Sequence, residues 1–258
     1  MLSFGRETTR LLEIAYQGAD FSARRRVAFD ALAPGPGEVI VDIGCGNGWL
    51  SADLARAVGA RGRLIGIDPS REMRAAAAER CADCGWARID EGTAGQLPLD
   101  AQSIDKAVSV QVFEYLDDIP AALHEAHRVL KPGGRLVIGD IHFDSWIWFS
   151  DDPARMRRMM SVWDDHLAEP AVPALLPAML KEAGFSLLQI VPMTICDHQL
   201  RPDGLAMMLS RLMPRYAVAN GLIPTAEAEA WGAEQTALAA AGRFFFSVTH
   251  FVLSAQRR

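Results

Sequence analysis

The sequence contains no apolar run close to the ~20 residues that a membrane-spanning helix needs. It also lacks an excess of basic residues: the formal net charge is -6 and the pI is ≈ 5.5, which do not favour a nucleic-acid partner. The first twenty residues carry acids and lack the apolar core of a signal peptide. We therefore expect a cytoplasmic protein with no membrane span and no nucleic-acid partner.

Cysteine is scarce, with only Cys45, Cys81, Cys84 and Cys196. Without a signal peptide these residues need not pair, and a reducing compartment fits them best. Cys81 and Cys84 form a Cys-x-x-Cys pair, but there is no second pair and no nearby histidine to complete a zinc site. The pair is therefore interpreted as residues that end a helix, with a redox or metal role as the second interpretation.

Internal repeats and low-complexity linkers are also absent, and 258 residues suit one large α/β domain. Short apolar runs alternate with amphipathic segments through the first 140 residues. Repeating β-α units with short links predict a parallel sheet covered by helices on both faces. The expected strands are Glu38–Ile43, Arg63–Ile67, Trp86–Asp90, Asp105–Val110 and Arg135–Gly139. The expected helices are Arg6–Tyr16, Ser22–Leu32 with Ser22 as N-cap, Trp49–Val58, a helix capped by Ser70 that runs to Cys81, and Pro120–Leu130 with Pro120 in its first turn.

The pattern changes after Asp140. Residues 141–183 are rich in Trp and Met and are expected to form a helical cap, which would act as a mobile lid. A sixth strand, two more helices and a last strand suited to a sheet edge should follow. Their expected positions are Phe185–Val191, 203–219, 224–241 and Phe244–Leu253. The predicted fold is one doubly wound, Rossmann-like domain over residues 1–258, with a mostly parallel seven-stranded sheet and an antiparallel edge strand. Its parts are N-terminal helices at 1–32, a core at 38–140, the cap at about 141–183, and helices with the edge strand at about 185–258.

The strongest local signal is a glycine-rich turn after the first strand, Asp42-Ile43-Gly44-Cys45-Gly46-Asn47-Gly48. Glycines there let the backbone approach a ligand closely, at the strand ends where doubly wound sheets bind ligands. The spacing is Gly-x-Gly-x-Gly, and not the Gly-x-Gly-x-x-Gly of dinucleotide-binding proteins. Asp42 also precedes the turn, where dinucleotide folds usually carry an apolar residue.

From about Arg24 to Gly139 the chain resembles the class I S-adenosylmethionine-dependent methyltransferases. Within them it is most similar to the type 11 branch, which includes the ubiquinone and menaquinone C-methyltransferases. The resemblance continues through four further segments. They are Leu64-Ile65-Gly66-Ile67-Asp68, Glu91-Gly92-Thr93-Ala94-Gly95-Gln96-Leu97-Pro98-Leu99, Ser103-Ile104-Asp105-Lys106-Ala107-Val108-Ser109-Val110-Gln111 and Arg128-Val129-Leu130-Lys131-Pro132-Gly133-Gly134.

The resemblance implies S-adenosylmethionine as the cofactor and assigns residues to its parts. Asp42, Gly44 and Gly46 would hold the methionine moiety. Asp68, followed by Pro69, would accept hydrogen bonds from the ribose hydroxyls, as acids do in dinucleotide folds. The remaining residues of the implied cofactor site are Thr93 and Ala94 beside the adenine, Gln111, and Tyr16 on an N-terminal helix, where simple packing explains the tyrosine equally well.

One residue departs from the family pattern. Family members usually have Asp at the position of Thr93, where the acid accepts a hydrogen bond from the adenine amino group. A threonine hydroxyl accepts the same bond without charge, so the bond should be weaker. We therefore expect looser cofactor binding.

Residues for the methyl acceptor are expected after the fourth and fifth strands. Flat aromatic walls suit a ring-bearing or apolar acceptor, although the same side chains could bury the cap. The candidate acceptor-binding residues are Phe143, Trp146, Trp148 and Phe149. A base is needed only for an acceptor that must lose a proton, and the candidates are His142 and Tyr115. Asp140, His142 and Asp144 alternate along one strand face, but no further ligands cluster nearby, so no metal is expected.

The predicted function is therefore methyl transfer from S-adenosylmethionine to a small, apolar or aromatic molecule, driven mainly by in-line positioning. Two alternatives stay open. One is a non-methylating S-adenosylmethionine-binding protein of the same fold, either a cyclase or a regulator. The other is a nicotinamide oxidoreductase, against which the glycine spacing argues.

Overall fold

The computed structural model describes residues 14–258, which form two compact units. Unit 1 contains residues 14–24, His142–Pro170 and Thr194–His250. Unit 2 contains Arg25–Ile141, Ala171–Met193 and Phe251–Arg258. The expectation of a single domain over residues 1–258 stays a prediction. None of the helices in the described part of the chain is long and apolar enough to cross a membrane.

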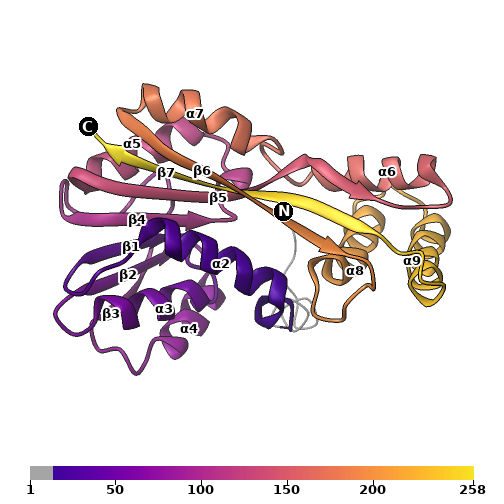
Figure 1. The fold of residues 1–258 in the computed structure, drawn as a ribbon, viewed down its shortest axis with the longest axis horizontal. Helices are drawn as coiled ribbons and strands as arrows, with labels where there is room; N and C mark the ends of the chain where they lie inside the picture. Colours follow the sequence, from indigo (N-terminus) through magenta and orange to yellow (C-terminus); the bar gives the residue numbers. More distant parts are fainter. Residues whose placement is uncertain (1–13) are drawn as a thin grey trace. The chain divides into compact units, whose positions relative to one another are not determined.

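A seven-stranded sheet organises the chain (Figure 1), in the order β3-β2-β1-β4-β5-β7-β6. Strands β3, β2, β1, β4 and β5 are parallel neighbours, and Figure 1 draws β7 antiparallel to β6. The mostly parallel, seven-stranded sheet predicted from the sequence is confirmed. The strands are β1 (Val39–Ile43), β2 (Arg63–Asp68), β3 (Ala87–Glu91), β4 (Ile104–Val110), β5 (Leu130–Trp148), β6 (Phe185–Asp197) and β7 (Phe246–Arg257).

The last strand does not occupy the expected edge. Strand β7 lies between β5 and β6, so β6 is the edge strand on that side. Burial explains the difference, since four consecutive residues of β7, 252–255, are buried and thus both faces of the strand are covered. Strand β6, in contrast, exposes Leu187, Leu188 and Ile190. The aromatic content of β7 therefore reflects a central position.

The helices follow the β-α alternation that the sequence indicates. Two helices have side-chain N-caps. The Ser70 hydroxyl accepts a hydrogen bond from the N–H of Met73 at the start of α4, and the Asp118 carboxylate accepts one from the N–H of Ala121 at the start of α5. Ser22 is not a cap, because α2 already begins at Ala19. The helices are α2 (Ala19–Leu32), α3 (Trp49–Val58), α4 (Arg71–Arg80), the 3-10 helix η1 (Phe113–Tyr115), α5 (Ile119–Val129), α6 (Pro153–Asp164), α7 (Val172–Glu182), α8 (Leu205–Ala219) and α9 (Thr225–Ala240).

Alternate residues of the parallel strands face two different cores in unit 2. Ile40 and Leu64 join one cluster with buried side chains of α2 and α3. Val41 and Ile65 join the other cluster with buried side chains of α5 and α7. This alternation covers both faces of the sheet with helices, as the doubly wound prediction requires.

The segment 141–183, expected to be helical throughout, begins instead as strand. Strand β5 runs to Trp148, and helices α6 and α7 follow it. Helix α6 belongs to unit 1, whereas α7 belongs to unit 2, where it contributes Leu176 and Leu180 to the core that α5 shares. Burial has the two-residue period of a strand from Ile141 to Phe143 and again from Trp146 to Trp148, with a change of phase between the two stretches, and the density of aromatic residues concealed this pattern. The helix expected at Arg6–Tyr16 lies mostly outside the described residues.

Unit 1 has an aromatic core. Trp148 packs edge-on against Trp231, Phe244 and Phe246, with ring centroids 5.3, 6.4 and 4.7 Å away. Its indole N–H donates to the Oε1 atom of Gln235 at 2.9 Å. The two Trp residues and both Phe residues are buried. This cluster supplies the apolar contacts that hold strand and helix together within unit 1.

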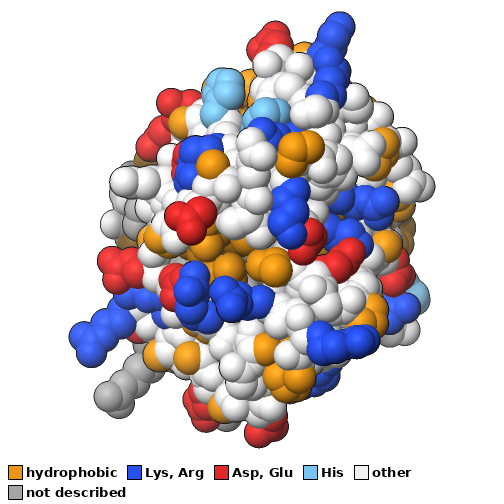
Figure 2. Space-filling model, turned by 90° about the vertical axis from the view of Figure 1, so that its left-hand side faces the viewer, with side chains coloured by type: hydrophobic (Ala, Val, Ile, Leu, Met, Phe, Trp, Pro, Cys, Tyr) orange, Lys and Arg blue, Asp and Glu red, His pale blue; other side chains and the backbone are white. Residues whose placement is uncertain are grey.

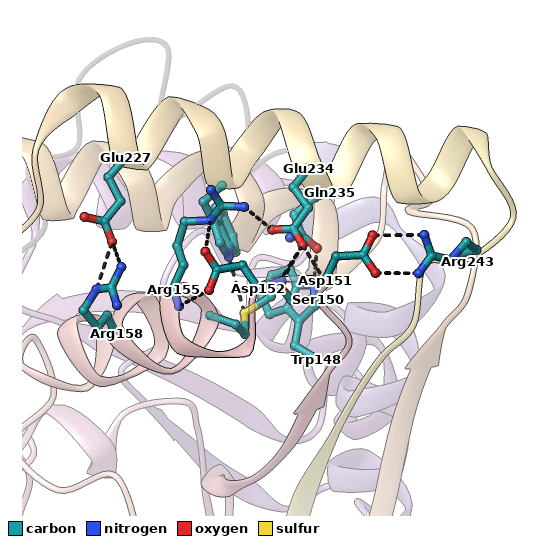
Figure 3. A network of polar contacts seen from close by, with 12 residues as sticks. Trp148, Ser150, Asp151, Asp152, Arg155, Arg158, Glu227, Glu234, Gln235 and Arg243 are labelled. Atoms are coloured by element: carbon teal, nitrogen blue, oxygen red, sulfur yellow. Dashed lines mark hydrogen bonds and ion pairs between the residues drawn. The ribbon is translucent and has the colours of Figure 1, made fainter.

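A carboxylate on α9 organises the start of α6 (Figure 3). Glu234 accepts hydrogen bonds from the Ser150 hydroxyl at 2.7 Å, the Asp151 N–H at 2.6 Å and the Arg155 guanidinium at 2.7 Å. Burial alone would raise the pKa of Glu234, but these hydrogen bonds outweigh it and lower the pKa. The charged acceptor thus ties α6 to α9 inside unit 1.

Candidate cofactor site at the carboxyl ends of the parallel strands

The glycine turn after β1 has a backbone that a ligand could approach closely. Gly44, Gly46 and Gly48 all have positive φ, at 70°, 53° and 82°, where side chains are disfavoured. A Cβ atom on Gly44 would lie 2.3 Å from the Cγ2 atom of Val112, so glycine alone fits there. Space is open above Gly46, where a Cβ atom would meet nothing within 4 Å. The turn thus leaves open space above Gly46 at the end of β1, where a ligand could lie close to the backbone.

Asp68, the last residue of β2, is fixed by two backbone donors. Its Oδ2 atom accepts the N–H of Gly46 and its Oδ1 atom accepts the N–H of Ser70, both at 2.9 Å. Burial raises the pKa of Asp68, while these bonds and the charge of Arg74 oppose that shift. Two oxygens offer about four acceptor positions, so the carboxylate retains capacity for further donors such as ribose hydroxyls.

Asp42, within β1, is buried beside the same turn. The Ser51 hydroxyl donates to its Oδ2 atom at 2.6 Å. Burial raises the pKa of Asp42 to about 7; the bond from Ser51 opposes the shift, and the negative charge of Asp68 adds to it. Acids whose pKa values are shifted by burial cluster at functional sites, and two such acids lie at this turn.

The segment from Glu91 to Leu99, which the family resemblance places beside the adenine, borders a surface pocket of about 330 Å³. Pro69 and Thr93 line this pocket together with Gln96 and Leu97. Thr93 is exposed, whereas Ala94 is buried beneath it. The pocket therefore brings Pro69, after β2, together with residues after β3, and a role in binding adenine stays a prediction.

The end of β4 holds a strained residue. Gln111 has φ 58°, a value that residues other than glycine seldom adopt, and its N–H donates to the carbonyl of Gly139 at 2.8 Å. Its side-chain amide lies 3.0 Å from both carboxylate oxygens of Glu114. The N–H of Val112 donates to buried Asp140 at 3.1 Å. Backbone strain of this kind clusters at functional sites.

Sequence reasoning missed Glu114, which is 1% exposed. The only available signal was a lone acid between Phe113 and Tyr115, just after a predicted strand. Helical or strand periodicity does not mark such an acid as buried. Its neighbour Tyr115, a candidate base, is 47% exposed at the end of η1.

The other predicted residues belong to unit 1. Tyr16 is half-buried and packs edge-on against Phe21, with ring centroids 5.0 Å apart. His142 is half-buried on β5, and its carbonyl accepts the hydroxyl of Ser145 at 2.6 Å. Because these two residues lie in a different unit from the glycine turn, their roles stay predictions.

The four candidate acceptor residues differ in exposure. Phe143, Trp146 and Trp148 are buried. Trp146 packs edge-on against both of the others, with ring centroids 5.5 Å from Phe143 and 6.3 Å from Trp148. Phe149 is 40% exposed and lies under the guanidinium of Arg243. The burial is typical of core side chains, and contact with an acceptor stays a prediction for all four.

Comparisons with known proteins decide the family. Residues 41–138 match the methyltransferase domain family, a stretch that includes the glycine turn, Asp68 and Thr93. Residues 41–138 therefore carry a methyltransferase domain. The family resemblance and the cofactor predicted from the sequence are thereby confirmed.

Two curated relatives and one solved structure show how far the likeness extends. The chain is 35% identical over 233 residues to an uncharacterised 37.1 kDa protein in transposon TN4556 of Streptomyces fradiae, covering 90% of this chain and 66% of that protein. It is 35% identical over 121 residues to the 2-phytyl-1,4-naphtoquinone methyltransferase of Synechococcus elongatus, covering 46% and 52%. The YcgJ protein of Bacillus subtilis has the same fold at 17% identity, with a TM-score of 0.64 and coverage of 92% and 99%. The chain thus spans between half and two thirds of these two curated relatives.

Proposed function

We propose that this methyltransferase-family chain transfers the methyl group of S-adenosylmethionine to a small, apolar or aromatic acceptor. The observation that carries the proposal is the junction of Asp68 with the glycine turn through the Gly46 N–H. It places two acids and three positive-φ glycines at the carboxyl ends of adjacent parallel strands, β1 and β2. That is where folds of this class bind ligands.

The residues of unit 2 fit the separate parts of the cofactor. Asp68 would accept the ribose hydroxyls, because its two bonds to backbone N–H groups fix the carboxylate and leave acceptor positions open. Asp42 and the turn at Gly44 and Gly46 would hold the methionine moiety, whose ammonium group suits a buried acid. The pocket beside Thr93 would take the adenine ring.

The cofactor supplies an activated methyl group on a sulfonium, with a neutral leaving group. The chain then contributes mainly position, since the two reacting atoms must be held in line and close to contact. Gln111 and Glu114 lie where β4 ends, and their rigid pairing would fix the wall of the site there. Tyr115 and His142 are proposed as proton acceptors for those acceptors that must ionise.

Relatives support an apolar or aromatic acceptor. The name of the Synechococcus elongatus relative specifies a phytyl naphtoquinone, which is a ring with a long apolar chain. The face of the molecule in Figure 2 carries interspersed acidic, basic and apolar side chains, with no face-wide patch of one charge. The relative's name, the mixed charges of this face and the aromatic segment that includes Phe149 are our grounds for proposing a small-molecule acceptor for this chain.

Two measurements test the proposal. Calorimetry should detect binding of S-adenosylmethionine and S-adenosylhomocysteine but not of NAD. A panel of naphthoquinols and phenols, incubated with the protein and S-adenosylmethionine, should then yield S-adenosylhomocysteine with at least one acceptor. Tighter binding of NAD than of either adenosyl compound contradicts the proposal. Binding without any product across the panel favours the cyclase or regulator alternative.

A further inference from the structure

Two cysteines stand at the end of α4, beside the glycine turn but outside the set that binds the cofactor. Cys81 ends the helix, and the N–H of Cys84 donates to the Cys81 carbonyl at 2.9 Å. Both side chains pack against the apolar cluster that α2 and α3 share with the sheet. The two thiols therefore stand at the two ends of one tight turn and contact the same apolar cluster.

This turn holds the Cα atoms of Cys81 and Cys84 near the separation that a disulfide needs. A turn closed by a hydrogen bond from residue i+3 to residue i keeps the outer Cα atoms within about 7 Å. Disulfides join Cα atoms about 4.4–6.8 Å apart. We propose that Cys81 and Cys84 form a reversible dithiol–disulfide site, oxidised by a peroxide, and that its oxidation weakens binding at the adjacent cofactor turn. The second part rests on the proposed function, and the first does not.

The reaction balances with peroxide as the oxidant. Cys84 is half-buried and Cys81 is buried, so peroxide reaches Cys84 first. The Cys84 thiol becomes a sulfenic acid and one water molecule leaves. The Cys81 sulfur then attacks the Cys84 sulfur, the S–S bond forms, and the hydroxyl leaves as a second water molecule. Burial raises the pKa of Cys81 to about 11, so the second step should accelerate as the pH rises above neutral.

A third thiol is a poor competitor. Cys45 lies within the glycine turn and is buried, and burial together with Asp42 and Asp68 raises the pKa of its thiol far above the ordinary value. The shift is larger than that of Cys81, so Cys45 is the slower of the two buried thiols. The exposed Cys196, on β6, is accessible but belongs to a separate strand.

The last turn of α4 transmits changes to the cofactor site by direct contact. The Arg80 guanidinium donates to the carbonyl of Asn47 and lies 4.1 Å from the ring centroid of Trp49. A Cβ atom on Gly48 would lie 2.7 Å from the Cα atom of Ala77. Because Cys81 directly follows Arg80, drawing its side chain toward Cys84 displaces the residue that holds the glycine turn.

Peptide masses test the site directly. Trypsin releases residues 81–88 as one peptide, Cys81-Ala82-Asp83-Cys84-Gly85-Trp86-Ala87-Arg88. After peroxide treatment of the folded protein and alkylation, this peptide should be unalkylated and lighter by two hydrogen atoms than the reduced peptide. Dithiothreitol should restore both thiols. A peptide that still carries two alkyl groups overturns the site, and a Cys45–Cys81 bridge, which joins two separate peptides, overturns the pairing.

Cofactor affinity tests the coupling. Oxidised protein should bind S-adenosylhomocysteine about tenfold more weakly than reduced protein, equivalent to about 1.4 kcal/mol. Cys84→Ser should abolish this response, whereas the matched control Cys196→Ser should retain it. Cys84→Ala serves as the second variant if serine disturbs the fold, which circular dichroism reports. Equal affinities of oxidised and reduced protein overturn the coupling. Failure of the reduced protein to bind at all refutes the proposed function, while the peptide masses still decide the disulfide.

Discussion

The Oδ2 atom of Asp68 accepts a hydrogen bond from the backbone N–H of Gly46 at 2.9 Å, across two neighbouring parallel strands. The bond orients the carboxylate and the glycine turn with respect to each other before a ligand arrives. Gly44 and Cys45 reinforce the junction, since the N–H groups of both donate to the carbonyl of Ile67. Such preorganisation reduces the ordering that binding must otherwise impose.

Asp68→Asn should weaken S-adenosylhomocysteine binding by about 1–3 kcal/mol, because a charged acceptor for the ribose hydroxyls and for two backbone N–H groups becomes neutral. Titration calorimetry measures the change. Asp100→Asn, at an exposed acid outside the site, is the matched control and should leave affinity unaltered. Equal affinities of the Asp68 variant and the parent chain would show that the ribose binds elsewhere.

Asp42 should make the unliganded protein less stable as the pH rises. Its pKa is about 7 in the folded chain against an ordinary 3.8, so folding favours the protonated form. Its contribution to stability is therefore full below the unfolded pKa and is lost between about pH 4 and pH 7. Asp42→Asn cannot ionise, so the stability difference between this variant and the parent should change across that interval. Urea unfolding at several pH values measures it, and a constant difference contradicts the assignment.

The same acid should couple cofactor binding to proton release. A bound sulfonium and ammonium favour the carboxylate form of Asp42, so affinity should rise with pH up to about 7 and then level off. Calorimetry in buffers of different ionisation enthalpy counts the released protons. Asp42→Asn should bind more weakly and release none through this group. Unchanged proton release in the variant would assign the titration to another residue.

Thr93→Asp should tighten cofactor binding, because a charged acceptor replaces a hydroxyl beside the pocket proposed for adenine. Thr93 is exposed, so the substituted carboxylate can reach solvent without a desolvation penalty. Thr93→Asn, similar in size but neutral, separates charge from shape. If aspartate binds no better than asparagine, the adenine amino group does not face this residue.

Trp148→Ala should destabilise the chain by about 3–5 kcal/mol, the range for a buried aromatic residue. The reason is loss of the edge-on contacts with Trp231 and Phe246 and of the bond to Gln235. Phe149→Ala, at the exposed neighbour, should have a far smaller effect. Chemical denaturation measures both. A near-neutral Trp148 variant with weakened acceptor binding would restore the interpretation as an acceptor wall.

Rules that depend on nearby residues were sufficient to predict much of the geometry of the candidate cofactor site. The glycines of the turn, the acid that ends β2 and the cap at Ser70 follow from backbone sterics and hydrogen bonding within a few residues, so the sequence by itself determined them. The parallel core also followed, because β-α repeats with short links admit few arrangements. These features depend on neighbours along the chain.

Tertiary structure decided what depends on distant partners. Whether Trp148 lines a ligand or a core depends on Trp231, far along the chain, which periodicity cannot report. The central position of β7 and the burial of Glu114 likewise arise when separate segments pack together. The raised pKa of Asp42 belongs to the same class, since a carboxyl group titrates according to the burial and charges that folding places around it.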